Sequence, residues 1–231
     1  AFGTAAKSLQ VAFVGEAGLR AAALADAGAT ADPRVVDDWL ALVGGDPDTP
    51  IPDGPAVPGG LAIKLFPCCY ALQRPIAAVR TLEPVPADEI RRIAVRTPAA
   101  SLAPLIHHSP VTGLEGKFSL EYGIAAALLD DRPGFDSFSD AGVERPEAMR
   151  LARLIEVAPS DDGGDQLLTG EVEIEIETRA GAGFHASLAL PPGAPDRPMT
   201  DEELTTKLEL CGAGEVAELS WESAAQFLRS L

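Results

Sequence analysis

Cysteine and histidine are scarce in this sequence, and long hydrophobic runs are absent. The 231 residues include 3 cysteines and 3 histidines. Cys68 and Cys69 are adjacent and cannot readily pair with each other, so we expect free thiols and a reducing cytoplasm rather than a disulfide framework. His107 and His108 are also adjacent, which makes no zinc-binding pattern. No apolar run reaches membrane-spanning length and no signal peptide is visible, so we expect no membrane.

Basic residues are scarce as well. Lys and Arg number 18 against 35 Asp and Glu, which gives a formal net charge of −17. Such a surface repels phosphate backbones, so we expect no nucleic-acid partner. A site for a carboxylate must then be a local concentration of Lys and Arg. The sequence begins at Ala1 without a Met, and we expect a truncated chain, a processed product or a split subunit of a longer protein.

Helical patterns occur at both ends of the chain. An Ala-rich helix is predicted over 14–27, with Gly28 as its stop. A second helix is predicted after Asp32, taken as its N-cap, with Pro33 in the first turn. Residues 46–60 are rich in Pro, Gly and Asp and indicate a linker. Beyond a second Pro-rich stretch at 191–198, Thr200 is expected to cap a helix to about Cys211, and Ser220 to open the last helix.

Strand and helix patterns mix between the two linkers. This predicts an α+β fold: an inserted α+β lid domain at 60–190, with residues 1–59 and 191–231 as helical segments of a larger all-α domain that pack together. The predicted strands are 61–64, 90–95, 154–157, 171–177 and 184–190, and the predicted helices are 69–81, 101–106, 119–129 and 145–153.

The segment Glu171–Glu177 alternates strictly between glutamate and apolar residues. This period of two predicts a strand with one solvated face. The alternative, a glutamate comb that binds a metal ion, is disfavoured because hard cations need converging ligands. We therefore expect no metal.

The segment Thr112–Tyr122 is a loop that leads into a helix. Lys117 and Tyr122 lie at the mouth of that helix. A cation and a phenol near a helix N-terminus make a seat for an anionic substrate. The alternative is an exposed lysine and a half-buried tyrosine that only pack.

Four segments together resemble the MmgE/PrpD family, which includes 2-methylcitrate dehydratase, cis-aconitate decarboxylase and iminodisuccinate epimerase. Residues 3–10 resemble the family pattern G-T-x-x-K-P-L-H, and residues 63–69 resemble I-K-P-Y-P-C-C. Residues 112–122 resemble the family signature almost letter for letter, and residues 197–204 resemble R-P-[LM]-[ST]-D-E-E-L.

The resemblance implies a large helical domain with a smaller lid, and an active site in the cleft between them. It implies proton transfer at carbon next to a carboxylate, with no metal and no organic cofactor. By position, it implies Lys7, Lys64 and Tyr122 as catalytic residues that converge on the cleft. Cys69 stands where some relatives have histidine and others cysteine, and we take it with Lys117 as substrate-binding.

These residue types suit that chemistry. Two ammonium groups can hold substrate carboxylates and stabilise a developing enediolate-like charge. A tyrosine hydroxyl can orient or pass a proton, and a lysine in a dry cleft can act as a base. The structural alternatives are a surface position for Lys7, core positions for Cys68 and Cys69, and structural roles for His107, His108 and Glu115.

Two departures from the family pattern leave two functions open. Gln10 replaces the family's histidine and cannot titrate near neutral pH, and the helical region that precedes this part in relatives is absent from the sequence. The first hypothesis is the C-terminal part of a lyase or isomerase that acts on a small di- or tricarboxylate by dehydration, decarboxylation or epimerisation. It would need the missing region, on this or a second chain, and alone would have little activity. The alternative is a non-catalytic split or degenerate homologue that acts as a binding or partner subunit. Either would form homo- or hetero-oligomers.

Overall fold

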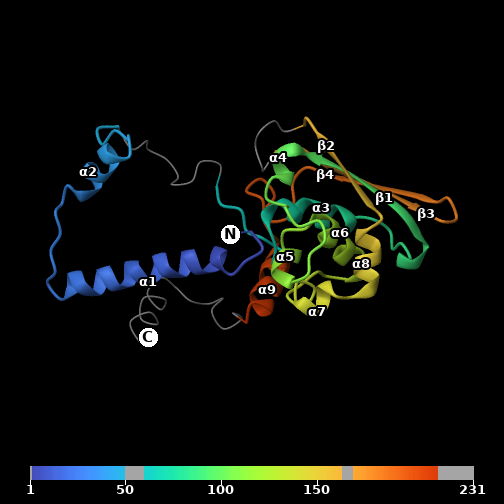
Figure 1. Ribbon diagram of the computed structural model, residues 1–231, viewed down its shortest axis with the longest axis horizontal. Coiled ribbons are helices and arrows are strands. Elements are labelled where there is room, and N and C mark those ends of the chain that lie inside the picture. The colour runs from blue at the N-terminus through green and yellow to red at the C-terminus, as the bar shows by residue number, and fades with distance from the viewer. Residues whose placement is uncertain (1, 50–59, 163–168, 213–231) are drawn as a thin grey trace. The chain divides into compact units, whose positions relative to one another are not determined.

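The computed structural model describes residues 2–49, 60–162 and 169–212 (Figure 1). The chain divides into two compact units. The first, here called the helical unit, is residues 5–60, and the second, the mixed unit, is residues 2–4 together with the chain from Leu61 onward. Most of the first predicted linker and the last predicted helix, from Ser220, lie outside the described residues. The packing of 1–59 against 191–231 stays a prediction.

The helical unit contains α1 (Ala6–Asp26) and α2 (Val35–Leu42). Helix α1 begins earlier than predicted, so that Lys7 lies in its first turn, and it ends before Gly28, which has φ +91° as the stop signal predicted. The prediction of Asp32 as the N-cap of α2 is wrong. Asp32 Oδ1 instead accepts a hydrogen bond from the Arg34 N–H at 2.9 Å, and Arg34 occupies the cap position.

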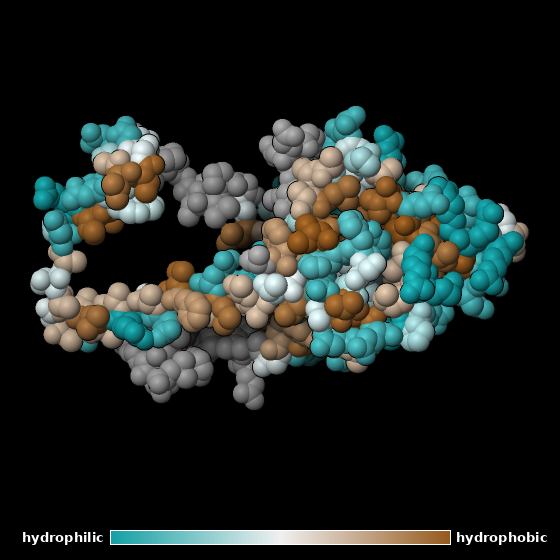
Figure 2. Space-filling model, viewed as in Figure 1, coloured by the Kyte–Doolittle hydropathy of each residue, from teal (hydrophilic) through white to brown (hydrophobic). Residues whose placement is uncertain are grey.

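Neither helix of this unit buries a residue. Apolar side chains therefore cover much of the surface of α1 and α2, as the brown regions of Figure 2 show. The large exposed ones are Leu9, Val11, Phe13, Val14, Leu19, Leu24, Val35, Val36, Trp39, Leu42 and Val43. Helical stability in proteins comes mainly from packing an apolar face, so both helices present surface suited to a partner.

The mixed unit combines short helices with a four-stranded sheet, which confirms the α+β prediction at this level. Its helices and strands are η1 (Tyr70–Leu72), α3 (Gln73–Val79), η2 (Ala87–Glu89), β1 (Ile90–Pro98), α4 (Ala99–Leu102), α5 (Gly113–Gly116), α6 (Leu120–Leu129), α7 (Asp140–Val143), α8 (Pro146–Ala152), β2 (Ile155–Ser160), β3 (Val172–Thr178), β4 (Gly183–Leu188) and α9 (Asp201–Leu210).

The sheet has the strand order β2-β1-β3-β4. Strand β1 pairs parallel to β2 and antiparallel to β3, and β3 forms the predicted hairpin with β4. The glutamate alternation on β3 has the predicted outcome: Ile174 and Ile176 are buried, and Glu173 and Glu175 are exposed. On the exposed face, glutamates of β2 and β3 pair with arginines of β1, as in the 2.6 Å contact of Arg92 with Glu156.

The helices cover the opposite face of the sheet (Figure 1). Helix α3 packs against β3 and β4, and α6 packs against α3 and α8. The approach of α6 to the preceding layer is close at Gly123, where an added Cβ would lie 3.1 Å from a Leu72 methyl group. Sheet, α3 and α6 thus stack in order, which places the N-terminus of α6 on the far side of the core from the charged face.

Two predictions of local structure are wrong. Residues 61–64, three apolar residues followed by Lys64, form no strand; the Ile63 N–H instead donates one backbone hydrogen bond to the Gly193 carbonyl at 2.8 Å. The helix predicted at 101–106 is the single turn of α4. Both segments are too short for periodicity to decide their structure. Elsewhere, the capping box of Thr200 and Glu203 on α9 is confirmed. Among the described residues, no helix is both long and apolar enough to cross a bilayer.

The opposite roles of neighbouring residues on β3 can be tested directly. Replacing Ile174 by Ala should lower the free energy of unfolding of the mixed unit by about 2–4 kcal/mol, because it empties a fully buried site. Replacing the adjacent Glu175 by Ala should change it by about 0.5 kcal/mol or less. Urea unfolding followed by far-UV circular dichroism measures both. Equal effects of the two substitutions would contradict the assignment of faces.

Candidate functional site

Four of the five predicted site residues belong to the mixed unit: Lys64, Cys69, Lys117 and Tyr122. Lys7 belongs to the helical unit. Lys64 is exposed on the segment that Ile63 fixes to Gly193. Gly193 has φ +82°, and a Cβ there would lie 1.9 Å from the Ile63 carbonyl oxygen, so only glycine permits this contact.

A buried glutamine holds the loop that carries the two cysteines. Gln73 Oε1 accepts the Phe66 N–H at 2.9 Å, while its Nε2 lies 3.0 Å from the Phe66 carbonyl oxygen and 3.3 Å from Cys68 Sγ. The side chain is fully buried. We did not predict this role from the sequence. The available signal was a glutamine at the start of α3, followed by Arg74 and then by an apolar run.

Lys117 is joined to this loop through the backbone. The Cys69 N–H donates to the Lys117 carbonyl at 3.0 Å. Lys117 caps the C-terminus of α5. Two residues later, the hydroxyl of Ser119 caps the N-terminus of α6 by accepting the Tyr122 N–H at 3.2 Å. Glu115 accepts the Val111 N–H at 2.7 Å, so it stabilises the turn that precedes Lys117. Lys117 is half-buried.

The electrostatics of Cys68 show that both lysine charges reach one place. Burial, together with the neighbouring Cys69, raises the pKa of the Cys68 thiol far above its ordinary value. Lys64 and Lys117 both act in the opposite direction and lower that pKa, as does the hydrogen bond from Gln73. Two ammonium groups from separate segments therefore act on the same sulfur. The contact that joins these segments is the backbone hydrogen bond from Cys69 to Lys117, and Lys64 precedes Cys68 by four residues in the chain.

Tyr122 is fully buried, and its hydroxyl donates to the Ser137 carbonyl oxygen. Its ring packs edge-on against Phe138, with ring centroids 5.9 Å apart. Burial raises the pKa of the phenol, against the lowering effect of a hydrogen bond and the charge of Arg145. The phenol is therefore neutral near pH 7, and its proton is held by Ser137.

Arg145 forms an ion pair beside Tyr122. Its Nη1 and Nη2 lie 2.5 and 2.9 Å from the two carboxylate oxygens of Asp130. Burial by itself raises the pKa of Asp130, but the hydrogen bonds from Arg145 and Ser137 outweigh it and lower the pKa below its ordinary value. The sequence analysis missed both residues, because a carboxylate and a guanidinium 15 positions apart carry no local signal.

The adjacent histidines point to different partners. His108 Nδ1 lies 2.8 Å from Glu121 Oε1, at the first turn of α6. His107 Nε2 lies 3.4 Å from the Phe2 carbonyl oxygen. Among the described residues, no group of three or more His, Cys, Asp or Glu side chains is arranged to hold a metal ion.

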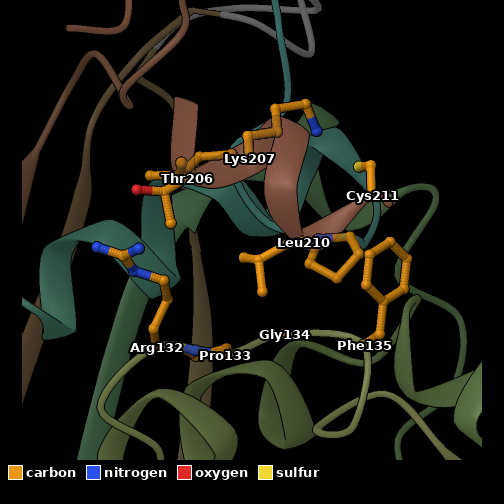
Figure 3. A pocket seen from close by; sticks show the side chains of 10 residues that line it. Arg132, Pro133, Gly134, Phe135, Thr206, Lys207, Leu210 and Cys211 are labelled. Carbon is orange, nitrogen blue, oxygen red and sulfur yellow. The ribbon is translucent and has the colours of Figure 1, made fainter. Parts of the chain in front are cut away.

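A small cavity lies between α9 and the loop at 132–135 (Figure 3). Its volume is about 20 Å³, enough for one water molecule but not for a dicarboxylate. Neither Lys64 nor Lys117 lines it. Its lining residues are Leu65, Pro67, Arg132, Pro133, Gly134, Phe135, Thr206, Lys207, Leu210 and Cys211.

Comparison with known proteins gives two findings. A family model described as the MmgE/PrpD C-terminal domain matches residues 66–229, well over half of the chain. A protein named cis-aconitate decarboxylase from Aspergillus terreus is 28% identical over 176 residues, which covers 69% of this chain and 35% of that protein. A second with the same name, from Aspergillus terreus strain NIH 2624 / FGSC A1156, gives the same identity and coverage. The chain thus spans about a third of the length of these curated relatives.

The role of Gln73 predicts a measurable loss on substitution. Replacing Gln73 by Leu should lower the free energy of unfolding by about 1–3 kcal/mol, because the buried Phe66 N–H and carbonyl lose their partner. The matched control is Gln10→Leu on the exposed surface of α1, which should change it by about 0.5 kcal/mol or less. Thermal unfolding compares the two. If the Gln73 substitution lowered stability no more than the Gln10 substitution, the hydrogen bonds between Gln73 and Phe66 would contribute nothing to stability.

The thiols of Cys211 and Cys68 should react with an alkylating agent at different rates. Cys211 is exposed, whereas Cys68 is buried with a raised pKa, so the Cys68 thiolate is almost absent at pH 8. Iodoacetamide at pH 8 should alkylate Cys211 first and Cys68 only after unfolding in urea. Mass spectrometry of the tryptic peptides locates each adduct. Rapid alkylation of Cys68 in the folded chain would contradict this environment.

Proposed function

Since this chain belongs to the MmgE/PrpD C-terminal domain family, we propose that it forms the C-terminal part of a cofactor-independent lyase or isomerase acting on a small di- or tricarboxylate. The observation that carries the proposal is the pair of lysines, Lys64 and Lys117, whose charges act together at the Cys68–Cys69 loop. In a chain with a net charge of −17, two ammonium groups at one place provide a local seat for carboxylates.

The proposed chemistry is proton transfer at a carbon next to a carboxylate. Removing that proton spreads negative charge onto the carboxylate oxygens, and fixed cations stabilise the charge as it develops. We propose that Lys64 and Lys117 bind the substrate carboxylates. We propose that Lys7 and Lys64 stabilise the developing negative charge or transfer the proton. Cys69 lies on the same loop, and we propose that it contacts the substrate. Dehydration and epimerisation begin from this step, whereas decarboxylation breaks the bond to carbon dioxide and then delivers a proton to the same carbon. The similarity to cis-aconitate decarboxylase supports decarboxylation among them.

Tyr122 can take part in the proposed proton transfer only under one condition. Its hydroxyl now donates to Ser137, so it can orient or pass a substrate proton only when it exchanges that acceptor for the substrate. The Arg145–Asp130 pair beside it keeps an arginine charge near the phenol oxygen, which would stabilise the phenolate formed in such a transfer.

We further propose that α1 and α2 belong to a larger all-α domain, with 60–190 as its inserted lid and 191–231 returning to it. The apolar surfaces of α1 and α2 and the greater length of the relatives support this. The remainder of that domain would come from the same protein or from a second chain, in a homo- or hetero-oligomer. Three free thiols support a reducing compartment, and we propose the cytoplasm.

The alternative is a binding or partner subunit without turnover. Gln10, in place of the family's histidine, and the burial of Tyr122 favour it. Assay of cis-aconitate with the chain alone, and again with the upstream helical region of a relative added, separates the two. Turnover that appears when the upstream helical region is added, and that is lost in the Lys64→Met variant, supports the enzyme hypothesis. Citrate binding with no turnover in either assay supports the alternative.

The lysine pair predicts a specific pattern of citrate binding. Replacing Lys64 or Lys117 by Met should weaken citrate binding about tenfold, because each removes one charge-assisted contact. The control Lys207→Met removes the same charge on α9, at the cavity of Figure 3, and should leave affinity unchanged. Isothermal titration calorimetry measures all three. Equal weakening at all three positions would mean that citrate responds only to net charge.

A further inference from the structure

Two residues of the mixed unit, His108 and Glu121, form a hydrogen-bonded pair next to the segment that carries Lys117. His108 Nδ1 lies 2.8 Å from Glu121 Oε1. The Glu121 side chain is only 12% exposed, whereas the His108 side chain is 78% exposed. Glu121 lies in the first turn of α6, and its second carboxylate oxygen lies 3.5 Å from the hydroxyl of Ser119, the N-cap of that helix. A carboxylate anchored in the fold therefore holds an imidazole that faces solvent.

This contact decides which ring nitrogen of His108 carries the proton. A carboxylate only accepts hydrogen bonds, so Nδ1 must be the donor to Glu121. The neutral ring then has its lone pair at Nε2, on the exposed side of the imidazole. A nitrogen in this state accepts a proton, and the carboxylate on the other side of the ring stabilises the imidazolium that results.

Backbone hydrogen bonds place the pair near the proposed carboxylate seat. The Cys69 N–H donates to the Lys117 carbonyl at 3.0 Å, and the His107 N–H donates to the Phe118 carbonyl at 3.3 Å. His108 follows His107, and Lys117 precedes Phe118, so the Cα atoms of His108 and Lys117 are at most about 15 Å apart. A lysine and a histidine side chain can share a small dicarboxylate across such a distance.

The other two histidines of the chain have different surroundings. His107 Nε2 lies 3.4 Å from the Phe2 carbonyl oxygen. His185 lies on β4 opposite Glu175 of β3, on the exposed and charged face of the sheet. Histidine is the side chain that most readily takes up and returns a proton near neutral pH. His108 is therefore the histidine that combines an exposed Nε2 with a position next to the Lys117 segment.

We propose that His108 transfers the proton at the substrate carbon next to the carboxylate, and that Glu121 is the positioning residue that fixes its tautomer. This rests on the proposed function for the substrate class and deepens it by naming the proton-transfer group. In the forward step the C–H bond breaks, its electron pair passes onto the carboxylate held by Lys64 and Lys117, and an N–H bond forms at Nε2. The reverse step delivers the proton to the carbon, as decarboxylation requires after carbon dioxide has left. The lysines then serve to stabilise the developing charge.

The tautomer is tested by NMR of the full chain with ¹⁵N-labelled histidine at pH 8. His108 should show the Nδ1–H form, whereas an imidazole in water prefers the Nε2–H form. Glu121→Gln should keep the Nδ1–H form, because the side-chain carbonyl still accepts, and Glu121→Ala should lose it. The variants His107→Gln and His185→Gln assign the signals. A dominant Nε2–H form of His108 in the unmodified chain would overturn the role of Glu121.

The position of His108 near the lysines is tested by alkylation of the full chain with iodoacetate, whose reactive carbon is next to a carboxylate. An anion bound by Lys117 brings that carbon to Nε2, whereas neutral iodoacetamide is not attracted. The ratio of iodoacetate to iodoacetamide labelling should be at least about five-fold higher at His108 than at His185. Citrate should suppress labelling of His108 by iodoacetate and not by iodoacetamide. Mass spectrometry of the peptides measures each adduct.

Two lysine variants serve as test and control for this labelling. Lys117→Met should lower the ratio at His108 about five-fold. Lys207→Met removes the same charge from α9 and should leave the ratio unchanged. Equal ratios at His108 and His185 in the unmodified chain, or the same fall in both lysine variants, would overturn the position of His108 next to the seat.

Proton transfer is tested with cis-aconitate in the assembly of this chain with the upstream helical region of a relative. His108→Gln should lower kcat at least about 100-fold and change KM by less than about two-fold, because a positioned acid–base group contributes about 10²–10⁴-fold. A glutamine can still donate to Glu121, so it would rescue a purely structural role. Glu121→Gln should lower kcat about ten-fold, because it keeps the tautomer and removes the charge that stabilises the imidazolium.

The two proposals fail in distinguishable ways. Full turnover by His108→Gln, together with loss of turnover in Lys64→Met, would overturn the role of His108 and leave the proposed function intact. Citrate binding without turnover in the assembly would overturn the proposed reaction and the role of His108 in it, and would favour the binding subunit.

Discussion

A sheet with isoleucine and valine on one face and glutamate and arginine on the other can bury only one of its faces. Strand β3 imposes this division, because its side chains alternate throughout between the two faces, and β1 follows the same alternation from Ile93 to Thr97. The buried face needs a cover, and α3 supplies it, with α6 in the next layer. The N-terminus of α6, with Lys117 just before it, is therefore placed by the sheet through α3.

The candidate site combines a dry interior with charged side chains at its edge. Cys68 and Gln73 are buried, and the loop they stabilise carries no charge of its own. Lys64 and Lys117 reach the same loop from two segments that are linked to it only through backbone hydrogen bonds and chain connection. Because the chain has a net charge of −17, these two lysines form a local concentration of positive charge.

Sequence patterns predicted the parts of this fold whose signals are local. The alternation at Glu171–Glu177, the capping box at Thr200 and the turn at Gly28 each depend on residues close in sequence, and each is confirmed. The three apolar residues before Lys64 looked like a strand, but strands need a partner, and within the described part of the chain this segment forms a backbone hydrogen bond only with Gly193.

For the site, motif resemblance selected Lys64, Cys69 and Lys117; the described structure joins Cys69 to Lys117 by a backbone hydrogen bond, and the roles of all three stay predictions. It could not select Gln73, Asp130 or Arg145, since their roles depend on contacts formed only after folding. The burial of Tyr122 was underestimated for the same reason: the ring is enclosed by Phe138 and by the 130–139 segment, which no helical period around Tyr122 reveals. Lys7, on α1 of the helical unit, stays a prediction.

The order of strands has a consequence for synthesis on the ribosome. Strand β1 is central, but both of its neighbours are translated later, after residues 99–154 have emerged. Until then both edges of β1 are unpaired, which is the condition under which strands associate with other chains. Arg91, Arg92 and Arg96 lie along this strand, and their charges disfavour such association. The arginines that pair with glutamates in the finished sheet would thus first protect a strand that has no partner.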